Sequence, residues 1–200
     1  MAENSRHKRA STDPILNEDG EVTRQLDFRN ERLQADLDWL AIDGSCLLQR
    51  RFVAEAEEGT YVQHDQKAIN VLKRTSYTIG SQLAARRQTR TLGRYFASPT
   101  LRGAPPRATA PPAEENPFFW CLHLFSLEHQ FISTGEKTKS SQAMLYAYRN
   151  HVPPEFLTGF IQQVGRDNAI AWSTEPDRRE KWFDGARKSM WIARLPQPSG

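Results

Sequence analysis

The chain has 200 residues, of which 38% are hydrophobic, 26% are charged and 10% are aromatic. This composition is polar, but its aromatic content is too high for a chain without a packed core. The sequence contains neither the roughly 20-residue apolar run of a membrane helix nor the apolar segment of a secretory signal peptide. Its two cysteines are too few for a disulfide framework. We therefore expect a cytoplasmic protein, or a nuclear one in a eukaryote.

Charge is strongly segregated along the chain, although the net charge is only +3. Residues 11–65 carry 13 acids and 5 bases, whereas residues 66–113 carry 9 bases and no acid. Residues 114–200 are balanced, with 10 of each. A long acid-free block indicates a negatively charged partner, and it carries no information about the fold.

The first part of the chain is predicted to be a basic arm followed by helices. Residues 1–20 are polar and rich in turn signals, which is typical of a disordered arm. In the N-terminal helical region, 21–102, leucines at helical spacing predict an amphipathic helix over 22–42. Asp43-Gly44 is expected to end it, and a shorter helix is expected over 46–56.

A third, basic helix is predicted over 66–97. Its apolar positions step by three and four residues, which is the heptad seam of a helix packed on a partner. Gly80 lies inside this helix and marks either a break or a close helix crossing. The seam consists of Ile69, Leu72, Ser76, Ile79 and Leu83.

Residues 103–117 contain five prolines, which predicts a semi-rigid linker. An aromatic-rich helical core is expected over 118–195, followed by a tail at 196–200. Because no stretch shows sustained alternation of period two, we predict a mostly α fold: a small helical protein with a disordered arm and a linker between two helical regions. The core helices are expected at 118–132, at 140–151, from Pro153-Pro154 to Gly165, and from about 177 to 193.

The arginines of the third helix form the sharpest functional pattern. Arg86, Arg90 and Arg94 are spaced i, i+4 and i+8, so they share one helix face, and Lys73 and Arg87 fall on a neighbouring stripe. Like charges at this spacing repel, and the phosphates of a nucleic acid would compensate them. We therefore predict nucleic-acid contacts by Lys73, Arg86, Arg87, Arg90, Arg94 and, in the linker, Arg102.

The aromatic side chains of Tyr77, Tyr95 and Phe96 are close enough in sequence to stack on unpaired bases. An alternative interpretation is that the acidic first helix packs on the basic helix and neutralises it. The charges would then be satisfied within the chain, or by a protein partner.

The functional hypothesis is a non-enzymatic regulatory or accessory protein that binds DNA or RNA, in transcription, replication or transfer of mobile DNA. The alternative is a structural or assembly protein, such as a helical adaptor or coat-like subunit. A homo-oligomer could form through helices 66–97 or 118–193. We expect no metal and no cofactor, because no cluster of ligands or catalytic groups has the required spacing.

Overall fold

The computed structural model describes residues 14–58, 63–97 and 110–180. These residues form a mostly helical fold, as predicted, and within them the only β-type pairing is a single bridge between Leu16 and Val22. The helices are α1 (Asn30–Trp39), α2 (Ser45–Glu58), α3 (Ala68–Ala85), α4 (Thr89–Ala97), α5 (Pro117–Phe125), α6 (Thr134–Arg149), α7 (Leu157–Val164) and α8 (Arg166–Trp172). A π-helical turn (Leu40–Gly44) joins α1 to α2, and 3-10 turns (His64–Gln66 and Pro154–Phe156) precede α3 and α7.

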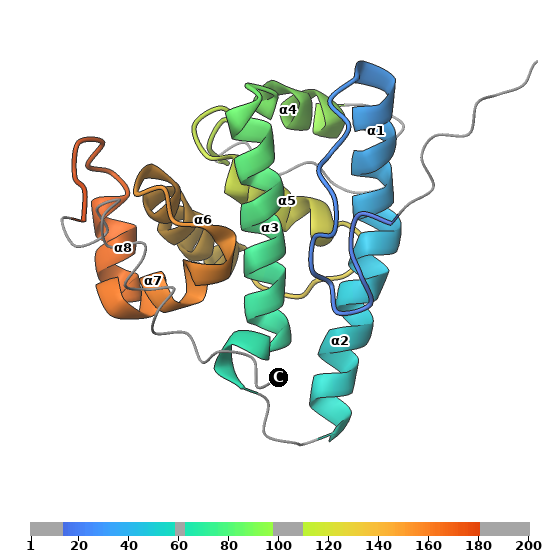
Figure 1. The fold of residues 1–200 in the computed structure, drawn as a ribbon, viewed down its shortest axis with the longest axis horizontal. Coiled ribbons are helices and arrows are strands. Elements are labelled where there is room, and N and C mark those ends of the chain that lie inside the picture. The colour runs from blue at the N-terminus through green and yellow to red at the C-terminus, as the bar shows by residue number, and fades with distance from the viewer. Residues whose placement is uncertain (1–13, 59–62, 98–109, 181–200) are drawn as a thin grey trace, which may run out of the picture.

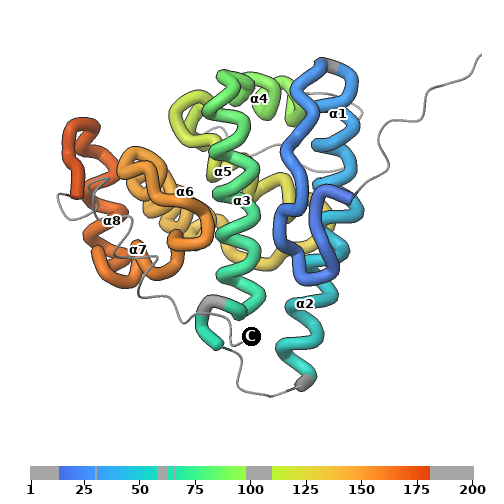
Figure 2. The backbone as a smooth tube through the Cα atoms, in the orientation of Figure 1, coloured from blue at the N-terminus to red at the C-terminus, as the bar shows by residue number. Residues whose placement is uncertain are grey.

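Helix α3 stands at the centre of the molecule (Figure 1). The α1–α2 rod lies on one side of it, and α6, α7 and α8 lie on the other (Figure 2). Helix α4 crosses the upper end of α3, while the 3-10 turn that precedes α3 lies at its lower end. The buried apolar side chains form one continuous core, to which residues on both sides of the proline-rich segment contribute.

The opening segment is extended, not helical as expected. The helix predicted over 22–42 begins only at Asn30, and Ile15 and Leu16, which we assigned to the disordered arm, are fully buried. The chain reverses direction between Leu16 and Val22, and Gly20 adopts the φ of +77° that this turn requires. A Cβ at Gly20 would also lie 2.8 Å from Leu48, so a larger residue would not fit without a shift. Residues 1–13 of the predicted arm lie outside the described residues.

Asp43-Gly44 does not end a helix, contrary to the prediction. The chain passes from α1 through the π-helical turn into α2 without interruption. An ideal Cβ on Gly44 would lie 3.4 Å from both Leu16 and Phe125. This glycine therefore serves close packing inside a continuous helix, which sequence cannot distinguish from a stop signal.

Gly80 marks a close helix crossing, one of the two alternatives predicted for it. A Cβ at this position would lie 2.7 Å from Cδ1 of Phe118, on α5. Phe118 is fully buried, and its ring stacks on Tyr77 at a centroid distance of 5.2 Å. The glycine thus brings α3 and α5 together across the boundary between the two predicted helical regions.

The C-terminal elements differ from prediction mainly at their ends. Helix α5 ends at Phe125 instead of Ile132, and α6 begins six residues before the predicted start at Ser140. Ser133 caps α6 by accepting a hydrogen bond from the backbone N–H of Glu136.

Gly165 ends α7 as predicted, with a φ of +84°. The short helix α8 that follows was not predicted. For the last predicted helix, residues 177–180 are not helical, and the remainder lies outside the described residues.

Candidate nucleic-acid interface

The predicted helix over 66–97 is two helices joined by a tight turn. The backbone N–H of Gln88 donates to the carbonyl of Leu83, and that of Arg87 donates to the carbonyl of Ala84. This is the Schellman pattern of helix termination, with Arg87 in the left-handed conformation at φ +56°. Glycine is the usual residue at this position, and its absence explains why the sequence predicts an unbroken helix. The shared arginine face predicted for Arg86, Arg90 and Arg94 is therefore wrong.

Helix α4 is fixed to the body of the protein by one apolar face. Leu92 is fully buried, and Tyr95 and Phe96 are buried. Burial, together with the nearby carboxylate of Asp38 on α1, raises the pKa of Tyr95. The ring of Phe96 lies 5.2 Å from that of Trp120 on α5. These contacts leave the opposite face of α4 to solvent.

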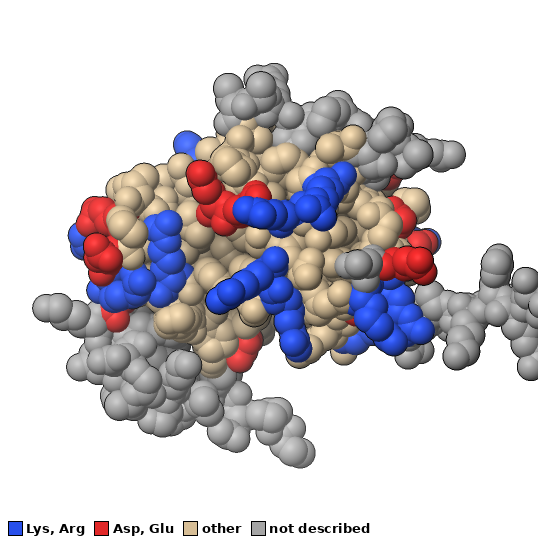
Figure 3. Space-filling view, turned by 90° about the horizontal axis from the view of Figure 1, so that it is seen from above, with Lys and Arg blue, Asp and Glu red and all other residues tan. Residues whose placement is uncertain are grey.

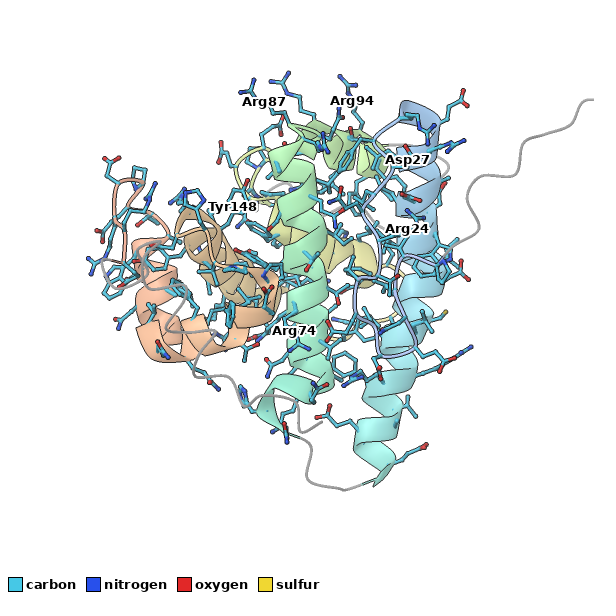
Figure 4. The ribbon with its side chains drawn as sticks, viewed as in Figure 1. Arg24, Asp27, Arg74, Arg87, Arg94 and Tyr148 are labelled. Carbon is cyan, nitrogen blue, oxygen red and sulfur yellow. The ribbon has the colours of Figure 1, made fainter. Side chains whose placement is uncertain are left out.

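The turn and the solvent face of α4 bring four arginines together despite the broken helix. All four are exposed and belong to the turn and helix at the upper end of α3. Figure 3 looks onto the molecule from this side and shows several Lys and Arg side chains on the surface, with some carboxylates beside them. Figure 4 shows Arg87 and Arg94 pointing away from the body beyond the upper end of α3. We call this surface the arginine end, and it consists of Arg86, Arg87, Arg90 and Arg94.

Only one of these arginines forms an ion pair among the described residues. Arg90 contacts the Glu114 carboxylate at 3.0 Å, and these side chains are 75% and 46% exposed. An exposed pair of this kind contributes little stability and is readily exchanged for another anion. The guanidinium of Arg86 lies over the ring of Phe28, 5.7 Å from its centroid.

Arg87 and Arg94 make no side-chain hydrogen bond or ion pair within the described part of the chain. Their guanidinium groups have five N–H donors each, and here these donors face solvent.

Four carboxylates of the acidic segment are paired with arginines outside the arginine end. Asp36, which is buried, forms a two-bond pair with Arg24 at 2.7 and 3.0 Å. Asp27 binds Arg29 and Arg32, and these contacts lower its pKa strongly. Similar pairs join Asp19 to Arg51 and Glu21 to Arg74. These acids therefore do not neutralise the arginine end.

Lys73 does not belong to this surface, contrary to the prediction. It lies near the lower end of α3, its side chain is 19% exposed, and its Nζ is 3.3 Å from Oε1 of Glu136. Burial lowers the pKa of Lys73, and the Glu136 charge opposes this effect only in part. Arg102, the remaining predicted contact, lies outside the described residues.

The predicted stacking residues are also absent from the surface. Tyr77, Tyr95 and Phe96 are at most 6% exposed, and the Tyr77 hydroxyl donates to the carbonyl of Val152 at 2.7 Å. None of the three predicted stacking residues is therefore available at the arginine end.

Sequence analysis missed the loop that borders the arginine end. The backbone N–H of Leu26 donates to Oε1 of Gln82 at 2.8 Å, which holds the 22–29 loop against the end of α3. Arg29 and Arg32 stand on this side, paired with Asp27. The arginines in residues 24–32 could have indicated this loop from the sequence. Its contact with α3, which joins residues 56 positions apart, could not be predicted from a local pattern.

Other types of site are weakly represented in the structure. Cys46 Sγ lies 3.8 Å from Nε2 of His129, but the described residues contain no group of three potential metal ligands. Among the described helices, none has the length and apolar character needed to cross a membrane.

Comparison with known proteins identifies no family model, no curated protein and no solved structure that matches this chain. The functional argument therefore depends on the residues themselves.

Proposed function

We propose that this protein binds nucleic acid through the arginine end, as a non-catalytic regulatory or accessory protein. The observation that supports the proposal is the concentration of four exposed arginines within nine consecutive residues, Arg86 to Arg94, at one end of a packed fold. Phosphate oxygens suit these groups because the planar guanidinium donates two parallel hydrogen bonds.

The pairing of two nearby acids with other arginines supports the proposal. A cationic surface adjacent to an acidic one would be neutralised within the chain if the acids had no other partners. Here Asp36 and Asp27 are held by arginines of their own segment. Because no carboxylate of the described residues pairs with Arg87 or Arg94, their positive charge supports binding to an external polyanion.

A double helix is the favoured form of the nucleic acid. Single-strand binding depends on aromatic rings that stack on bases, and the nearby aromatic rings Tyr95 and Phe96 are buried. Arg90 and Arg94 lie one helical turn apart, about 6 Å, on the solvent face of α4. Backbone contacts of this kind set position and affinity but do not read sequence.

The alternative, an assembly protein joined through the apolar seam of α3, has less support. Leu72, Ile79 and Leu83 of that seam are fully buried in the core of their own chain. They are not presented to a second protein.

Fluorescence anisotropy with a labelled duplex and the matching single strand tests the proposal. We expect the duplex to bind more tightly at low salt, and the Arg87→Glu/Arg94→Glu variant to lose about a hundredfold in affinity, since two charge-assisted contacts become repulsive.

Arg50→Glu/Lys139→Glu is the matched control, because it makes the same change in net charge at exposed residues outside the arginine end. If both variants weaken binding equally, the proposal is wrong and only net charge matters. Tighter binding of the single strand would contradict the preference for a duplex.

A further inference from the structure

A small cavity lies beside the lower end of α3, away from the arginine end. Its volume is about 210 Å³, and residues of α3, α7, α8 and the turn before α3 line it. Lys73 and Arg166 supply two cations to its wall, and Leu157 and Ile161 supply an apolar side. The other lining residues are His64, Asn70, Thr158 and Gln162, so none of the described lining residues is a carboxylate.

One carboxylate behind the wall balances both cations. Oε1 of Glu136 accepts from Lys73 at 3.3 Å and from Ser140 at 2.9 Å. Its Oε2 accepts from Arg166 at 2.5 Å. Among the described residues the local charge is therefore two cations against one anion, and this carboxylate is already shared among three donors.

Glu136 compensates the positive charge of Lys73 only in part. Its burial disfavours the ammonium ion, and the charge of Arg166 repels it, so both lower its pKa despite Glu136. The ammonium group has three donors, of which Glu136 takes one. An anion in the cavity would receive the remaining donors and restore charge balance.

Polar side chains at the mouth are already oriented. Nε2 of Gln162 lies 2.9 Å from Nδ1 of His64, and Nδ2 of Asn70 donates to the carbonyl of His64 at 2.6 Å. These contacts join α7 and α3 across the cavity, so its shape exists before any ligand enters. Such preorganisation lowers the entropic cost of binding.

We propose that this cavity binds a small organic anion, whose carboxylate or phosphate head contacts Lys73 and Arg166 and whose short apolar part lies against Leu157 and Ile161. The volume suits a molecule smaller than the drug-sized ligands of typical pockets, which occupy roughly 300–1,000 Å³. The site is separated from Arg86 by about 20 Å along α3, and the inference does not depend on the proposed function.

Titration of the full chain with butyl phosphate, butyrate and inorganic phosphate, followed by NMR at constant ionic strength, tests the site. We expect saturable shifts around Lys73 and Arg166, with butyl phosphate or butyrate binding more tightly than inorganic phosphate. The tighter of the two organic anions identifies the head group.

Lys73→Met and Arg166→Gln should each weaken this binding about tenfold, the effect of one lost charge-assisted contact. Lys139→Met, an exposed lysine on α6, should leave it unchanged. Each variant's thermal unfolding curve and NMR dispersion show whether it is folded.

Absence of saturable shifts in the folded wild-type protein would overturn the proposal, as would equal weakening by Lys139→Met. The Arg87→Glu/Arg94→Glu variant separates the two proposals, because it should weaken duplex binding about a hundredfold and leave anion binding intact.

Discussion

The two ends of α3 use basic residues from the same acid-free block in opposite ways. At the lower end, Lys73 and Arg74 are mostly buried and paired with Glu136 and Glu21, which come from distant parts of the sequence. At the upper end, Arg87 and Arg94 are exposed and have no partner among the described residues. A charge count along the sequence treats all four alike, whereas the fold decides which charges are available to a partner.

The contact that fixes α3 between these ends should be the most sensitive to substitution. Gly80→Ala would place a methyl group 2.7 Å from Phe118, and overpacking of this kind costs about 2–3 kcal/mol. Urea unfolding should show this loss, whereas Gly93→Ala on α4, where a Cβ meets only Ala113 at 4.0 Å, should not. Equal losses at the two glycines would contradict the close crossing.

Neutralising one charged side chain near each end of α3 should show which end depends on its charges for stability. Glu136→Gln leaves Lys73 and Arg166 facing each other without a carboxylate, and we expect it to lower the free energy of unfolding by about 2 kcal/mol. Arg94→Gln should change it by less than about 0.5 kcal/mol. Chemical denaturation measures both, and a similar cost at each end would remove the distinction.

The contribution of Glu136 should also depend on pH. Burial opposes its ionisation, but hydrogen bonds from Arg166 and Ser140 and the neighbouring cations outweigh this and lower its pKa below the ordinary 4.5. Its stabilisation is therefore complete above the ordinary value and is lost as the pH falls through the lowered one.

The stability difference between wild type and Glu136→Gln should consequently persist at neutral pH and shrink in strong acid. Urea midpoints across this range measure it. If the stability difference grows on acidification, the pKa of Glu136 is raised by folding and not lowered.

The smallest expected effect concerns the turn itself. Arg87→Gly removes a side chain from a left-handed residue, so it should raise the free energy of unfolding by about 0.5–1 kcal/mol while weakening duplex binding. His151 ends α6 in the same way, with φ +53°, and His151→Gly is the control that should gain stability without affecting binding. Unchanged binding by Arg87→Gly would exclude Arg87 from the interface.

The sequence predicted what local periodicity determines. Helical patterns located most of the buried faces, including Leu72, Ile79 and Leu83 of α3, and the acid-free block located the exposed arginines. Helix ends were less predictable because their signals depend on context. Arg87 ends a helix without a glycine, while Gly44 is inside a helix that a glycine was expected to end.

The candidate sites were predictable only in part for a similar reason. The partners of Lys73 and Arg74 are more than fifty residues away in sequence, so no local pattern indicates that these two basic residues form ion pairs. Helical spacing also grouped Lys73 with Arg87, although they lie near opposite ends of α3. Burial of Tyr95 and Phe96, which prevents them from stacking on bases, depends on contacts with α1 and α5.

The salt dependence of duplex binding tests the central claim most directly. If the four residues of the arginine end neutralise phosphates, a plot of the logarithm of affinity against that of salt concentration should have a slope of about −3 to −4. Arg87→Gln/Arg94→Gln should reduce its magnitude by about two. A slope that this variant leaves unchanged, or no binding at low salt, would show that these arginines do not contact nucleic acid.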